Sequence, residues 1–241
     1  MTFRETFFSN FMLKVSRYGE FNDPFDLNIG DYEASLSEKD AEEFYNLKPD
    51  HYKTADYYFE TDQEIEIGAR ASVAILCFSG AFNSIPMWSH YAQNHTGVCV
   101  GYDADCDVFN TKYDCEYSDN IGELRPVEYT NERPKFILKS DLINDTSDWF
   151  KKSVDWSYEK EHRILLPMSR AKILGTKPKC ILDYNKEVMW GFNIEPTNIK
   201  NIIMGCRMKE SDKQCIREAT KSFDIEIIEA HTDPSYYKLN F

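Results

Sequence analysis

The sequence lacks most motifs that identify an enzyme class by inspection. Its 241 residues contain no Gly-x-Gly-x-x-Gly, no Gly-Lys-Ser/Thr and no Gly-x-Ser-x-Gly, so no dinucleotide fingerprint, P-loop or nucleophile elbow is recognisable. The seven cysteines include no Cys-x-x-Cys pair. His90 and His95 are five residues apart, with no nearby Glu or Cys to complete a tetrahedral site. We therefore predict no metal cofactor.

Positive charge is also scarce. The chain has 28 Lys and Arg against 41 Asp and Glu, a net charge of −13, which argues against binding to a phosphate backbone. No apolar run approaches the ~20 residues that a membrane span needs. The first 21 residues lack a basic start followed by an apolar core, and the scattered cysteines are typical of a reduced protein. We expect a cytoplasmic protein without a membrane partner.

Strand patterns outnumber helix patterns along the chain. Apolar runs bounded by turn residues predict strands at 11–18, 72–80, 98–103, 124–130, 156–167, 201–208 and 225–230. Helical patterns fall within 37–68 and at 86–97, 145–154 and 211–222. Few strand–helix–strand crossovers are visible. These patterns predict one α+β domain over residues 1–241, with a mixed, mainly antiparallel sheet and flanking helices.

The first candidate site lies on the expected strand at 156–167. Alternation would place Glu159, Glu161 and Arg163 on one face of the strand. Two carboxylates this close perturb each other's pKa, and such a pair can stabilise a developing cation. The alternative is a solvated strand edge where Glu161 and Arg163 form a surface ion pair of little energetic weight.

The second candidate site is the segment "PMWSHYAQNHTGVCVGYD", residues 86–103. On a helix, Trp88, Tyr91 and His95 would share one face, and His90 would point elsewhere. In the functional interpretation, Trp88 or Tyr91 packs on a planar ligand and His90 donates a hydrogen bond. In the other, the aromatic face belongs to the core and His90 is a structural histidine.

Several motifs, taken in order, resemble a bacterial domain family of unknown function, DUF2971. They are "FNDPFD", "MWSHYAQNHTGVCVGYD", "VEY" and "WSYEKEHRILLP". The resemblance runs from about Phe11 to the end of the sequence. The strand that usually opens the family is not recognisable before Phe21, which implies either a truncated start or the loss of this strand. The family name implies no activity. The Asn-Asp pair of the first motif, Asn22 and Asp23, would shape a loop at the mouth of a pocket.

A weaker pattern is similar to ADP-ribosyltransferase-like enzymes, whose late strand carries a Glu-x-Glu motif. That similarity implies NAD as substrate, with Glu161 as the catalytic carboxylate and Glu159 orienting the acceptor. Tyr91 would stack on nicotinamide, His90 would bind the ligand and Arg163 would hold Glu161. The similarity implies a toxin or a phage-defence (antiviral) effector.

Two other functions stay open. One is a non-catalytic recognition module that binds a protein or nucleotide signal through the aromatic and polar cluster. The other, a metal-dependent nuclease, is disfavoured by the acidic composition. Convergence of Glu159, Glu161, His90 and Tyr91 on one cleft would favour catalysis over the recognition module.

Overall fold

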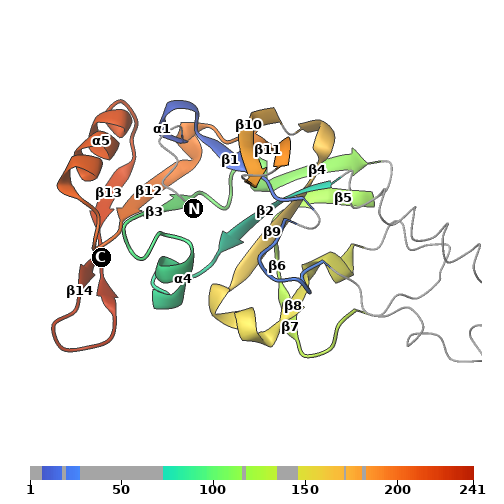
Figure 1. Ribbon diagram of the computed structural model, residues 1–241, viewed down its shortest axis with the longest axis horizontal. Coiled ribbons are helices and arrows are strands. Elements are labelled where there is room, and N and C mark those ends of the chain that lie inside the picture. The colour runs from blue at the N-terminus through green and yellow to red at the C-terminus, as the bar shows by residue number, and fades with distance from the viewer. Residues whose placement is uncertain are drawn as a thin grey trace, which may run out of the picture.

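The structure is a computed structural model, and it describes residues 7–17, 20–27, 73–115, 118–134, 146–170, 172–180 and 183–241. The helices expected within 37–68 lie outside these ranges. Several small sheets, most of them antiparallel, are packed side by side with few helices (Figure 1). The predicted α+β class with mainly antiparallel pairing is confirmed.

The central sheet has the order β2-β9-β6. Its strands are β2 (Val73–Ser79), β9 (Glu161–Pro167) and β6 (Arg125–Pro126), all paired antiparallel. β2 and β9 are paired along their whole length, from Val73 opposite Pro167 to Ser79 opposite Glu161. Both faces of their apolar halves are buried in core clusters, because β2 runs "VAIL" against the "ILL" of β9.

A second sheet, of order β13-β12-β3, lies beside the central sheet (Figure 1). It contains β3 (Val98–Tyr102), β12 (Ile199–Met204) and β13 (Glu226–Glu229). β12 and β13 are parallel, and α5 (Glu210–Thr220) makes the crossover between them. Ile216 of α5 packs on Ile202 and Met204 of β12, and all three are fully buried.

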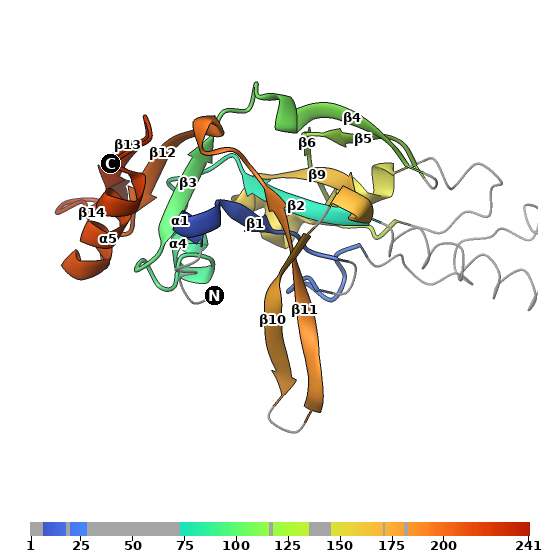
Figure 2. The same cartoon turned by 90° about the horizontal axis from the view of Figure 1, so that it is seen from above.

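The third sheet, of order β1-β11-β10, joins the N-terminal segment to a long hairpin. Its strands are β1 (Met12–Lys14), β10 (Lys172–Cys180) and β11 (Asp183–Asn193). The hairpin of β10 and β11 extends away from the body of the molecule (Figure 2). After β1, Ser16 forms an isolated bridge to Ile75 of β2 and so ties this sheet to the central one.

The remaining elements are short. Two-stranded pairs are formed by β4 (Asn110–Cys115) with β5 (Ser118–Glu123), β7 (Glu128–Thr130) with β8 (Lys151–Ser153), and β14 (His231–Thr232) with β15 (Leu239–Asn240). The short helices are α1 (Phe7–Asn10), α4 (Ile85–His90), η2 (Asp107–Phe109), η3 (Ser147–Phe150), η4 (Val154–Glu159), η5 (Met168–Arg170) and η6 (Pro196–Asn198). None of the helices in the described ranges is long and apolar enough to cross a membrane.

Three elements differ from the sequence-based expectation. The expected strand at 156–167 begins only at Glu161, because residues up to Glu159 form the 3-10 helix η4 and Lys160 adopts a left-handed conformation with φ 45°. The expected helix at 86–97 ends at His90, and Gln93, Asn94 and His95 follow in left-handed turns. The short helix predicted at 145–154 is η3 followed by β8.

Candidate functional site

A buried cluster of charged side chains lies where β9 begins. It brings together three carboxylates, on Asp26, Glu159 and Glu161, with two cations, Lys152 and Arg163. The five side chains come from the loop at 20–27, β8, η4 and β9. Each is almost completely shielded from solvent, so these charges interact far more strongly than surface pairs do.

Arg163 and Glu161 form the centre of the cluster. Both side chains are on the same face of β9, as the alternation of the sequence predicted. Arg163 Nε donates to Glu161 Oε1 at 2.6 Å, and its Nη2 donates to Asp26 Oδ2 at 2.8 Å. Its Nη1 donates to the carbonyl of Trp149 at 2.8 Å. The guanidinium thereby links β9 to the loop at 20–27 and to η3.

Lys152 connects the two carboxylates of the Glu-x-Glu motif. Its Nζ donates to Glu159 Oε2 at 2.7 Å and to Glu161 Oε2 at 2.8 Å. Burial by itself would raise the pKa of Glu161, but the adjacent Arg163 and Lys152 outweigh burial and lower that pKa to about 2. Glu161 is therefore an ionised carboxylate paired with two cations. Glu159 lies on η4, so the two glutamates do not share a strand face as the sequence predicted.

Asp26 lies at the far side of the cluster. Its Oδ2 faces Arg163 and, at 3.4 Å, Lys152, whereas its buried Oδ1 has no hydrogen-bond partner among the described residues. Burial raises the pKa of Asp26, and the two neighbouring cations compensate only in part. Of the three carboxylates, Asp26 is therefore the one with an unmet hydrogen-bonding requirement.

Tyr91 bonds to this cluster and is also partly exposed to solvent. Its hydroxyl donates to Glu159 Oε1 at 2.6 Å, while 41% of the residue is exposed. Burial of the hydroxyl and the bond to Glu159 raise the pKa of Tyr91, so the phenol stays protonated. Ser79 adds a second link, because its hydroxyl donates to the Glu159 carbonyl at 2.6 Å.

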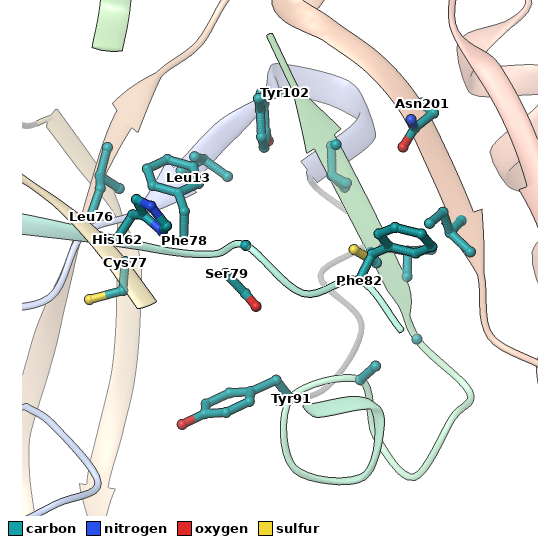
Figure 3. A pocket seen from close by; sticks show the side chains of 18 of the residues that line it. Leu13, Leu76, Cys77, Phe78, Ser79, Phe82, Tyr91, Tyr102, His162 and Asn201 are labelled. Carbon is teal, nitrogen blue, oxygen red and sulfur yellow. The ribbon is translucent and has the colours of Figure 1, made fainter. Parts of the chain in front are cut away.

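Tyr91 and Ser79 also line a cavity of about 880 Å³ between the central sheet and the β13-β12-β3 sheet. Most of its wall is apolar, and a few polar groups from different strands interrupt it (Figure 3). The labelled lining residues are Leu13, Leu76, Cys77, Phe78, Ser79, Phe82, Tyr91, Tyr102, His162 and Asn201. This volume and this lining are typical of a site for a small organic ligand.

The other candidates predicted from the sequence, Trp88 and His90, lie outside the charge cluster. Trp88 is buried in a core cluster with Ile203 and Leu239, and its Nε1 donates to the Phe82 carbonyl at 2.7 Å. His90 is exposed, and its ring lies 6.2 Å from that of Tyr158. Glu159, Glu161, Arg163 and Tyr91 are therefore brought together, whereas Trp88 packs as a core residue and His90 stays at the periphery.

The Asn-Asp pair contributes to the local turn. Asn22 is exposed, and buried Asp23 accepts a hydrogen bond from the backbone of Phe25 at 2.9 Å through Oδ1. This turn places Asp26, which sequence reasoning missed, against Arg163. Lys152 was missed as well. The sequence signal for both was weak, because an Asp in a turn motif and a Lys in "FKKSV" are usually solvated.

The fold and site thus define an α+β protein with a buried charge cluster beside an apolar cavity. Residues 87–164 match the family described as "Protein of unknown function (DUF2971)". This segment runs from α4 to the middle of β9, and it confirms the expected resemblance for the motifs that lie within it. The "FNDPFD" motif and the residues after 164 lie outside the match. Comparison with curated proteins and with solved structures finds no match. The likeness to ADP-ribosyltransferases stays a prediction.

Proposed function

We propose that this protein is an NAD-using enzyme of the ADP-ribosyltransferase or NAD glycohydrolase type, with its nucleotide substrate in the cavity between the two sheets. The observation that carries the proposal is the position of Tyr91. One side chain contacts the carboxylate of Glu159 at 2.6 Å and also forms part of the cavity wall. A ligand in the cavity would therefore lie next to the buried carboxylates.

The reaction needs a carboxylate near a developing positive charge. Cleavage of the nicotinamide–ribose bond passes through an oxocarbenium-like state, which an ionised carboxylate stabilises. Both oxygens of Glu161 are bonded to cations, so we assign it to holding Lys152 and Arg163 in place. Glu159 reaches the cavity through Tyr91. We assign Glu159, which the sequence pattern suggested only as the acceptor-orienting residue, as the carboxylate nearest the substrate.

Calorimetric titration with NAD and ADP-ribose, combined with an assay for released nicotinamide, tests this proposal. We expect the wild type to bind NAD and release nicotinamide. Glu159→Gln should bind but release nicotinamide at least about a hundredfold more slowly, because it loses the carboxylate nearest the substrate. Tyr91→Phe should weaken binding or turnover. Tyr236→Phe, which alters an exposed tyrosine outside the cavity lining, serves as the matched control.

The outcome also tests the second candidate, a recognition module for a nucleotide or protein signal. All three carboxylates are paired with Lys152 or Arg163. Such a network can have the structural role of holding the loop at 20–27 on the sheet, and a structural role for the carboxylates favours a module without catalysis. Binding of NAD or ADP-ribose without release of nicotinamide would support this module. A folded wild type that binds neither ligand contradicts the NAD proposal.

We place either function in the cytoplasm. Five cysteines in the described ranges are free thiols: Cys77, Cys99, Cys106, Cys206 and Cys215. Free thiols in this number are usual in a reducing compartment. Cys77, expected from the sequence to be a small buried hydrophobe, is exposed on the strand face that also carries Arg163.

A further inference from the structure

Two residues in the second sheet are poor strand formers, and they are paired with each other. Asn201 of β12 lies directly opposite Gly101 of β3. Both residue types are depleted in strand interiors, where Asn competes for backbone hydrogen bonds and Gly has no side chain to pack. Gly101 is flanked by Val100 and Tyr102, and Asn201 is followed by Ile202, all of them common strand residues. The pair lies next to an irregularity in the β12–β3 register, between Ile199 and Asn201. Irregularities of this kind often occur beside binding sites, where they redirect a side chain.

The two residues depend on each other for space. A Cβ atom on Gly101 would lie 2.4 Å from Asn201 Oδ1 and 3.3 Å from Asn201 Nδ2. The amide of Asn201 therefore occupies the space over the Gly101 backbone that any larger residue would fill. Glycine at 101 allows the amide to lie close to β3, in the position seen in Figure 3.

Both residues are part of the cavity wall, in a region that is otherwise apolar. Cys99, Ile203 and Ile228 surround them, and Phe82 and Phe241 line the same cavity. The rings of Phe82 and Phe241 pack edge to face, 5.0 Å between centroids. The Asn201 side chain is half-buried, and within the described part of the chain its amide forms no hydrogen bond with another residue. An amide without an internal partner on an apolar, aromatic wall is available to a ligand.

We propose that Asn201 is a specificity-determining residue that reads the edge of a planar heteroaromatic group bound in the cavity. A side-chain amide offers one acceptor and one donor side by side, which matches a ligand edge carrying a neighbouring donor and acceptor. Adenine has such an edge, and so does a carboxamide on a pyridine ring. The inference rests on the proposed function, because NAD carries both groups, and the test distinguishes between them.

The test compares three ligands: NAD, ADP-ribose, which has only the adenine, and nicotinamide mononucleotide, which has only the carboxamide. Asn201→Leu removes the amide and adds a residue that suits a strand. Loss of both hydrogen bonds should weaken binding of the recognised half, and of NAD, roughly tenfold to a hundredfold. The other half-ligand should be unaffected. Thermal unfolding of the variant checks that it is folded.

Gly101→Ala supplies a second, independent variant. The added methyl group displaces the Asn201 amide without removing it, so it should weaken the same ligand. The double variant should bind no more weakly than Asn201→Leu alone, because both changes act through one amide. Asn193→Ala is the matched control, since it removes an exposed amide that bonds to Glu195 away from the cavity.

The results separate this inference from the proposed function. If the wild type binds NAD and Asn201→Leu binds each of the three ligands as tightly as the wild type does, the assignment of Asn201 is wrong and the proposed function stands. If the folded wild type binds none of the three, both are overturned. Selective weakening of one half-ligand by both single variants supports the assignment and identifies the group that is read.

Discussion

Arg163 is a completely buried guanidinium that holds two carboxylates from distant parts of the chain. It bonds to Glu161, two residues away, and to Asp26, 137 residues away. Taking such charges out of water is costly, and only close pairing makes their burial tolerable. We infer that Arg163 acts mainly by fixing the loop at 20–27 and the orientation of Glu161.

Replacement of Arg163 by Met should therefore destabilise the protein strongly. It keeps a long side chain but leaves Asp26 and Glu161 buried with one cation, Lys152, between them. We expect a loss of about 3–5 kcal/mol in the free energy of unfolding, measured by urea denaturation. Lys200→Met, which breaks the exposed pair with Asp103 at 2.8 Å, should change the stability little, because water screens a surface pair. Similar values for the two variants would show that the buried cluster contributes no special stability.

At the scale of elements, the turn after α4 is held by a close backbone approach. Gln93, Asn94 and His95 adopt positive φ angles of 50°, 54° and 70°. The His95 carbonyl accepts from Arg207 N at 3.0 Å, and Gly205 N donates to the Gly97 carbonyl at 2.9 Å. Glycine at 205 lets these two backbone segments meet, and the turn then presents Tyr91 to the cavity.

A methyl group at position 205 should disturb this contact. The Cβ of Gly205→Ala would lie 2.2 Å from the His95 carbonyl oxygen, and a backbone atom cannot rotate aside. We expect a loss of roughly 2–4 kcal/mol in stability. Gly80→Ala is the control, because its nearest contacts would be ordinary ones at 3.4 Å. Equal melting temperatures for the two variants would contradict this account of the turn.

The same elements show how far the sequence could be interpreted. Long apolar runs such as 72–80 and 201–208 identified β2 and β12, because burial on a sheet leaves a direct mark on composition. Short turns left no such mark. Lys160 in a left-handed conformation ends η4 and delays β9 until Glu161. Periodicity could not detect this break, since tertiary contacts impose it on an ordinary residue.

The site was predictable only in part, for a related reason. The motifs identified Glu159, Glu161, Arg163 and Tyr91, which are close together in the chain or in one matched segment. Asp26 and Lys152 meet them only through the tertiary fold. Asn201 was missed because a polar residue in a strand is informative only once its partner, Gly101, and the cavity are known.

For the molecule as a whole, the cavity lies between one edge of β2, beyond the bridge at Ile75, and one edge of β3. Ile75 bonds to Ser16 on the side of β2 away from β9, so the alternating ladder turns the backbone groups of Cys77 and Ser79 to that same side. Likewise, the Gly205–Gly97 bond implies that Val98 and Val100 direct their backbone groups away from β12. In the described ranges, neither edge pairs with another strand there, and all four residues line the cavity.

A ligand between the sheets should therefore protect both edges at once. In hydrogen exchange with and without NAD, the amides of Cys77, Ser79, Val98 and Val100 should exchange quickly in the free protein and at least about tenfold more slowly in the complex, because the ligand shields them or bonds to them. The amides of α5, which packs on the far side of β12, provide the internal control and should change little. Protection confined to β2 or to β3 would show that the ligand binds one sheet alone, and protection spread evenly over α5 would indicate general stabilisation instead of a site between the sheets.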